Sequence, residues 1–119
     1  MFAIALWNKN NKNLSLACDR VGEKPIYYGW VNNKFVFASE LKAIKKFPEF
    51  KNSIDRSSLA LFLRLNSIPA PYSIYKDIFK VEPGQIIRLE AGSKRVKKHN
   101  FWSIEKVYKK GSLNQFPFN

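Results

Sequence analysis

Two residue types that could carry out chemistry occur once each in this sequence, as Cys18 and His99. A cysteine nucleophile needs a neighbour that favours the thiolate, and Arg20 could lower the thiol pKa of Cys18. The apolar residues before Cys18 instead predict a small core side chain at the end of a strand. His99 lies among Lys97, Lys98 and an asparagine, which predicts a solvated surface histidine. Neither residue has the partners of a catalytic pair nearby in the sequence.

Other motifs of catalysis and metal binding are absent from the sequence. The nine acidic residues are dispersed, and no two have the spacing of a glycosidase pair or a metal site. The five glycines form no phosphate-binding loop. A single cysteine excludes an internal disulfide and a zinc cluster built on cysteines. Composition and spacing therefore predict a domain without an evident active site.

The sequence also indicates the cellular compartment of the chain. No apolar run approaches the roughly 20 residues that a membrane helix needs. The N-terminus has no basic region before its apolar run and no small-residue cleavage site after it, so a signal peptide is not expected. With only one cysteine, we expect a reducing, cytoplasmic setting.

The charge of the chain is strongly positive. Lysine and arginine number 21 against nine acidic residues, a net charge of +12, which invites a nucleic-acid or membrane-surface interpretation. Seven of the basic residues fall within residues 94–110. Most of the basic residues are lysines, whereas the side chain that makes paired hydrogen bonds to nucleic-acid bases is typically arginine. Asparagine is abundant as well. This composition favours a solvated basic surface over a nucleic-acid-binding surface. Whether the basic surface has a binding partner is left open by the sequence.

At 119 residues and 13.9 kDa the chain has room for one domain, in which strands come first. Two helices are expected after the first four strands, one over 40–47 with Ser39 as N-cap and one ending near 65 with Asp55 as N-cap. The first strand is apolar on both faces and needs cover on both sides, so either later elements wrap over it or a preceding half of the domain is missing. The expected strands are 2–7, 14–18, 26–31 and 34–38 as a four-strand meander, followed by 85–90 and 96–102.

Several segments together resemble the glutaminase domain of glutamine-hydrolysing asparagine synthases. Residues 19–28 (DRVGEKPIYY) and 37–44 (FASELKAI) are similar to segments found in class II amidotransferases more broadly. Residues 69–84, which begin with Pro-Ala-Pro, resemble the asparagine synthase branch in particular. Residues 1–8 and 101–103 resemble the flanking parts of the same family segment.

The resemblance implies a fold and a division of the chain. The fold would be α+β, a partial αββα sandwich of the N-terminal nucleophile hydrolase type, with mainly antiparallel strands and two short helices. Residues 1–103 would be a partial glutaminase domain. Residues 104–119 would be the start of a linker, which we expect to be frayed.

The resemblance also implies what this chain lacks. Family members use a cysteine directly after the initiator methionine as nucleophile, whereas position 2 here is Phe2. The family's glutamine-binding residues precede the strand that matches 2–7. We therefore assign no catalytic, cofactor-binding or metal-binding residue, and expect the chain alone to be inactive. ATP and Mg²⁺ would belong to the synthetase domain of the full-length parent.

For the matching residues the resemblance implies mainly architectural roles. Met1, Arg20, Glu23 and Lys24 would lie toward the interface with the synthetase domain or the ammonia tunnel, although Met1 could equally have no role. The expected partners are the missing glutaminase half and the synthetase domain. The parent would convert glutamine, aspartate and ATP into asparagine, glutamate, AMP and pyrophosphate. Two alternatives remain open: another class II amidotransferase as parent, and a stand-alone basic binding module.

Overall fold

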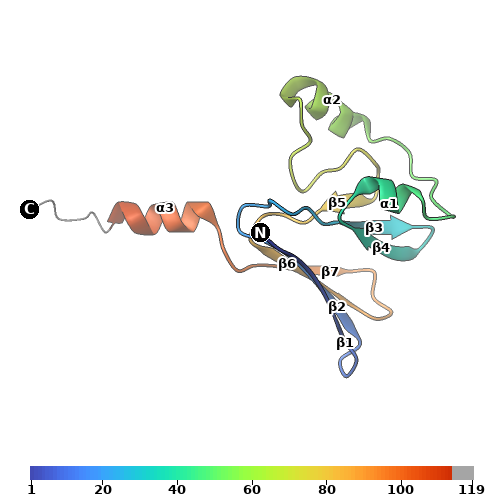
Figure 1. Ribbon diagram of the computed structural model, residues 1–119, viewed down its shortest axis with the longest axis horizontal. Coiled ribbons are helices and arrows are strands. Elements are labelled where there is room, and N and C mark those ends of the chain that lie inside the picture. The colour runs from blue at the N-terminus through green and yellow to red at the C-terminus, as the bar shows by residue number, and fades with distance from the viewer. Residues whose placement is uncertain (114–119) are drawn as a thin grey trace, which may run out of the picture.

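The computed structural model describes residues 1–113 and shows an α+β fold of antiparallel strands and few helices (Figure 1). The α+β class and the mainly antiparallel pairing are as predicted from the sequence. The strands are β1 (Ala3–Asn8), β2 (Asn13–Cys18), β3 (Tyr27–Val31), β4 (Lys34–Ala38), β5 (Ile78–Lys80), β6 (Gln85–Glu90) and β7 (Val96–Asn100). The helices are α1 (Leu41–Lys45), α2 (Arg56–Leu65) and α3 (Ile104–Leu113).

The strands form two sheets, so the prediction of one four-strand meander is wrong. Sheet A has the order β1-β2-β6-β7, and sheet B has the order β4-β3-β5. Every pairing in both sheets is antiparallel. The chain leaves sheet A at Cys18, runs through the loop 19–26, and begins β3 in the other sheet. Strand β6 later returns to pair with β2, which completes sheet A from a distant part of the sequence.

The hairpin between β3 and β4 forms as the sequence predicts. Asn32 and Asn33 both have positive φ values, 46° and 62°, and join Val31 to Lys34. Asparagine tolerates this left-handed region better than most residues, and two such residues match the right-handed twist of the flanking strands.

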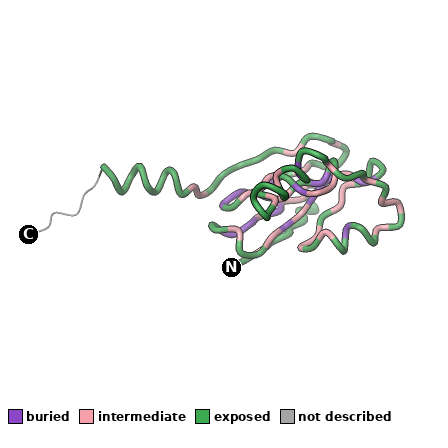
Figure 2. Tube along the Cα trace, turned by 90° about the horizontal axis from the view of Figure 1, so that it is seen from above, coloured by how far each residue is buried: buried purple, intermediate pink, exposed green. Residues whose placement is uncertain are grey.

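The main core lies between the two sheets. Leu16 and Ile87 of sheet A pack in one buried cluster with Tyr28 of sheet B. Figure 2 shows the buried residues gathered in the strand-bearing body, while the α3 segment is exposed along its length. Burial of these apolar side chains is the principal stabilising contribution to such a fold.

A second, smaller core joins sheet B to helix α1. Ile44 of the helix packs with Val31 and Ile78 of the sheet. The helix begins at Leu41, and Glu40 is its N-cap with extended backbone and no side-chain capping bond. The prediction of Ser39 as N-cap is therefore wrong by one residue. Sheet A, sheet B and α1 thus form successive layers.

Helix α2 has the boundaries that its sequence predicts. The Asp55 carboxylate accepts a hydrogen bond from Ser57 N–H at 3.1 Å and so caps the N-terminus. At the other end Asn66 adopts the left-handed conformation, with φ 55°, and its N–H donates to the Phe62 carbonyl. The helix stands away from the sheets (Figure 1), and Leu63 on its surface is 77% exposed.

Two elements were not expected from the sequence. Strand β5 pairs with β3 over three residues. Helix α3 is a third helix where two were expected, and it projects away from the body (Figure 1). It occupies the first part of the segment expected to be a linker; residues 114–119 of that segment lie outside the described residues.

Candidate functional site

The most organised polar feature of the chain is the loop that follows β2, which we call the Asp19 loop (residues 19–24). The Asp19 side chain is almost fully buried, with 4% of its surface exposed. Its carboxylate accepts four backbone hydrogen bonds, from the N–H groups of Lys24 at 3.0 Å, Val21 and Glu23 at 3.1 Å each, and Phe2 at 3.3 Å.

These hydrogen bonds explain how a carboxylate is buried here without a cationic side chain. The Lys24 N–H is the largest of the effects that hold the pKa of Asp19 well below its usual range, and burial acts in the opposite direction. The N–H groups of Glu23, Phe2 and Val21 add to the lowering. A carboxylate that accepts several backbone N–H bonds keeps its charge, because those bonds favour the ionised form. The Asp19 carboxylate therefore fixes the backbone conformation of the loop through these hydrogen bonds.

Backbone contacts attach the same loop to the start of β6. The Asp19 carbonyl accepts hydrogen bonds from Gly22 N–H at 3.3 Å and from Gly84 N–H at 2.9 Å. Both glycines have positive φ values, 73° and 68°, which strain other residues. A Cβ on Gly84 would also lie 2.5 Å from the Trp102 carbonyl oxygen. The loop thus ties β1, β2 and the beginning of β6 together.

Cys18 is part of this framework rather than a reactive thiol. Its side chain is 1% exposed and its Sγ lies 3.4 Å from the Lys24 carbonyl oxygen, to which it donates. Burial, followed by the charge of Asp19, raises the pKa of the Cys18 thiol. The sequence-based prediction of a core cysteine is confirmed, and Arg20 does not activate it.

The four residues predicted at an interface or tunnel lie at or beside the Asp19 loop. The side chains of Met1, Arg20, Glu23 and Lys24 are exposed. Glu23 and Lys24 contribute backbone N–H groups to the carboxylate, and Met1 precedes Phe2, which contributes another. Their proposed role at an interface is untested and stays a prediction.

Asp19 itself was missed as a functional candidate. The signal that could have identified it is its place directly after a buried strand, followed by a glycine-containing loop. Such loops present several free N–H groups to a nearby acceptor.

The other chemistry-bearing candidates do not converge. His99 is exposed on β7, as predicted. Within residues 1–113, no three His, Cys, Asp or Glu side chains gather closely enough to hold a metal ion.

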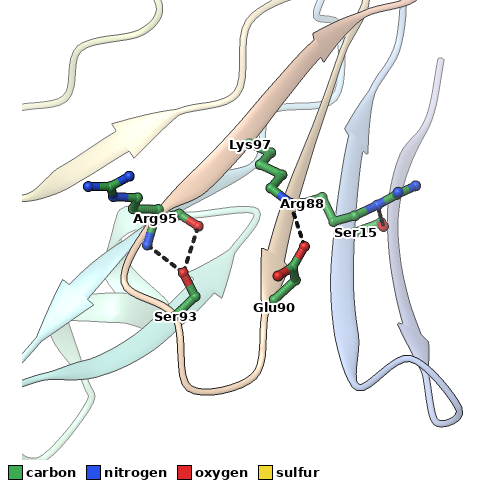
Figure 3. Close-up of polar contacts among 6 residues, drawn as sticks. All are labelled: Ser15, Arg88, Glu90, Ser93, Arg95 and Lys97. Atoms are coloured by element: carbon green, nitrogen blue, oxygen red, sulfur yellow. Dashed lines mark hydrogen bonds and ion pairs between the residues drawn. The ribbon is translucent and has the colours of Figure 1, made fainter.

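The basic residues of the β6–β7 hairpin make local surface contacts (Figure 3). Arg88 Nε lies 3.4 Å from Ser15 Oγ on the neighbouring strand, and Lys97 pairs with Glu90 at 2.6 Å. In the turn, Ser93 Oγ accepts from Arg95 N–H at 3.0 Å. The side chain of Lys97 is 72% exposed, so this pair contributes little to stability.

Comparison with known proteins identifies the family. A model of the glutamine amidotransferase domain matches residues 1–102. The chain belongs to the glutamine amidotransferase family. The matched residues include the Asp19 loop, both sheets and the β6–β7 hairpin.

Several relatives of this amidotransferase chain carry the names of asparagine synthetases, and one is named as an amidase. A Methanocaldococcus jannaschii protein named as a glutamine-hydrolysing asparagine synthetase is 35% identical over 95% of this chain. Glutamine-hydrolysing asparagine synthetase 1 of Bacillus subtilis is 37% identical over 71% of it. A Gibberella zeae protein named amidase chry2 is 30% identical over 87%. The chain spans 23%, 13% and 15% of the lengths of these three relatives.

Among the described residues, no helix of this amidotransferase chain has the length and apolar character needed to cross a membrane.

Proposed function

We propose that this chain forms the structural second half of the glutaminase domain of a glutamine-dependent asparagine synthetase. The observation that carries the proposal is the amidotransferase match over residues 1–102, together with relatives named as glutamine-hydrolysing asparagine synthetases. In this proposal sheets A and B are part of an αββα sandwich of the N-terminal nucleophile hydrolase type. The core between the two sheets supports that arrangement.

The role of the chain is to provide a framework rather than the nucleophile. The Phe2 N–H donates to the Asp19 carboxylate and so helps to fix the Asp19 loop. Cys18 is buried and its pKa is raised, which disfavours the thiolate that nucleophilic attack needs. The chain alone is therefore expected to hydrolyse no glutamine.

ATP and Mg²⁺ belong to other parts of the parent protein in this proposal. ATP phosphates are commonly held by a glycine-rich loop, and Mg²⁺ by carboxylate ligands. The residues of this chain do not fit them: its sequence has no such loop, and residues 1–113 hold no acidic cluster.

The Asp19 loop is the proposed contact with the synthetase domain. Its backbone is fixed by the buried carboxylate, while the side chains of Arg20, Glu23 and Lys24 point to solvent. A loop of fixed backbone and exposed charged side chains is suited to a polar interface between domains. In the parent reaction, ammonia released from glutamine would cross this interface to activated aspartate.

A replacement experiment tests the proposal. The matched 118 residues of the M. jannaschii relative are replaced by this chain, and asparagine formation is measured with glutamine and, separately, with ammonium as nitrogen donor. The ammonium reaction is the control for a folded synthetase. We expect both activities in the chimera. A chimera that uses ammonium but not glutamine, although its parent uses both, would contradict the proposal.

A further inference from the structure

The face of sheet B that looks toward sheet A carries several aromatic side chains. Tyr28 is buried in the core between the sheets, so its side chain points toward sheet A. Phe79 of β5 lies directly opposite Tyr28 in the ladder, and the centroids of the two rings are 5.8 Å apart. Side chains two residues apart on a strand share a face, which places Trp30 beside them. Phe79 is 39% exposed, so this aromatic face reaches solvent at the β5 edge.

Strand β7 adds a lysine to the same space from sheet A. Residues directly opposite each other in an antiparallel ladder share a face of the sheet. Lys98 lies opposite Ile87, which belongs to the core between the sheets, so Lys98 points to the inner face of sheet A. Lys97 lies opposite Arg88 and pairs with Glu90 on the outer face (Figure 3). The two neighbouring lysines of β7 therefore lie on opposite faces.

These side chains meet in a hollow between the two sheets, beside strands β5 and β7. The hollow has a volume of about 270 Å³. Its lining includes Tyr28, Trp30 and Phe79 from sheet B, and Lys94, Val96 and Lys98 from the β6–β7 hairpin. The volume is small for a ligand pocket and suits one ring system. The Lys94 ammonium is held in place here, because it donates to Asn33 Oδ1 of the β3–β4 turn at 2.8 Å.

The hollow is positively charged. Among the described residues, those that line it include two ammonium groups and no acidic side chain. An ammonium group has three hydrogen-bond donors, of which Lys94 uses one on Asn33. The ion pairs found within residues 1–113 involve other lysines than Lys94 and Lys98. Aromatic faces stack on planar rings, and ammonium groups bind carboxylates and phosphates, so the lining suits a ring that bears an anionic group.

We propose that this hollow binds a small planar aromatic anion, with its ring against Trp30 and Phe79 and its carboxylate or phosphate on Lys94 and Lys98. Aryl carboxylates and nucleoside monophosphates share this chemistry. An inward-pointing lysine on an edge strand also prevents unwanted strand pairing, but that function alone needs neither an aromatic wall nor a second ammonium group. The site is separate from the proposed framework role, because neither Cys18 nor the Asp19 loop lines the hollow.

A titration of the full chain with cinnamate and, separately, with adenosine monophosphate tests the proposal. The readout is the indole N–H resonance of Trp30 in NMR spectra, with Trp7 and Trp102 as internal references because neither lines the hollow. We expect a saturable shift of the Trp30 resonance with at least one probe, and weaker binding at higher ionic strength. The probe that binds more tightly identifies the source of the anionic ring. The uncharged analogues, cinnamamide and adenosine, should bind about tenfold more weakly.

The decisive variant is Lys98→Gln, which removes the charge and keeps a polar side chain. The matched control is Lys97→Gln, the same change at the neighbouring position of β7 on the opposite face. Both lysines are exposed, so both variants should fold. We expect Lys98→Gln to weaken binding of the anionic probe about tenfold and Lys97→Gln to leave it unchanged.

Several outcomes would overturn the proposal. The first is the absence of a saturable shift with either anionic probe. Equal weakening in Lys98→Gln and Lys97→Gln would reduce the effect to general attraction by a chain of net charge +12. Uncharged analogues that bind as tightly as the anions would leave an apolar hollow without an anion site. Unchanged binding in Lys98→Gln would leave this lysine as a charge that protects the edge strand.

Discussion

Asp19 and Phe2 hold each other by two hydrogen bonds across 17 residues of sequence. The Asp19 carboxylate accepts from Phe2 N–H at 3.3 Å, and the Phe2 carbonyl accepts from Asp19 N–H at 3.1 Å. The pair fastens the beginning of β1 to the end of β2. It also fixes which backbone groups of β1 face β2, because these directions alternate along a strand.

Replacing Asp19 by asparagine should destabilise the chain. An amide in the same place has one acceptor oxygen and brings an NH₂ group toward backbone N–H donors, so at least some of the four hydrogen bonds are lost. We expect Asp19→Asn to lower the urea midpoint of unfolding clearly more than Asp77→Asn, the same change at an exposed position. Equal midpoints for the two variants would show that the buried carboxylate does not organise the loop.

The same carboxylate should make stability depend on acid. The pKa of Asp19 in the folded chain lies below its ordinary value of 3.8, so the unfolded chain takes up the proton first. Its contribution is therefore complete above about pH 4 and is lost as the pH falls through 3.8 toward the lower folded value. The fall in urea midpoint between pH 7 and pH 3 should be larger for the wild type than for Asp19→Asn. A fall of the same size in both would be inconsistent with a lowered pKa.

Gly29 should not tolerate any side chain. A Cβ at this position in β3 would lie 1.9 Å from the Asp77 carbonyl oxygen, which is backbone and cannot rotate away. We expect Gly29→Ala to cost about 3 kcal/mol or more of unfolding free energy, measured by urea denaturation. The control is Gly111→Ala in α3, where a Cβ meets nothing within 4 Å. It should raise helix content and leave the midpoint of the body unchanged.

The core between the sheets should be sensitive to truncation at Leu16. This side chain is 1% exposed and packs with residues of both sheets. Leu16→Ala should cost about 2–5 kcal/mol of unfolding free energy. Leu63→Ala on the exposed surface of α2 should change it by less than about 0.5 kcal/mol. A small loss at Leu16 would mean that the two sheets do not share a packed core.

Elements with local signals could be predicted from the sequence. The paired asparagines at 32 and 33 specify a hairpin because their own backbone preferences suit it. Asp55 and Asn66 mark the ends of α2, since capping depends on residues within a few positions. The core position of Cys18 followed from its apolar neighbours in the same strand.

Elements that depend on distant contacts could not be predicted. Strand β5 is only three residues long and is formed by pairing with β3, about 50 residues earlier. The division into two sheets is set by the pairing of β6 with β2. No local sequence pattern indicates this pairing. The role of Asp19 depends on N–H groups that the loop brings together, including that of Phe2. The third helix has an apolar stripe, yet its residues from Ile104 to Leu113 are exposed, so no packing signal specified it.

A glutaminase assay on the purified chain tests most directly whether this chain is a framework without a nucleophile. Glutamate released from glutamine is measured for the wild type and for Cys18→Ala, because Cys18 is the single cysteine in the sequence. We expect that neither protein releases glutamate above the buffer control, since the thiol is buried and its pKa is raised. Release by the wild type that Cys18→Ala abolishes would contradict the claim that this chain is a framework without a nucleophile.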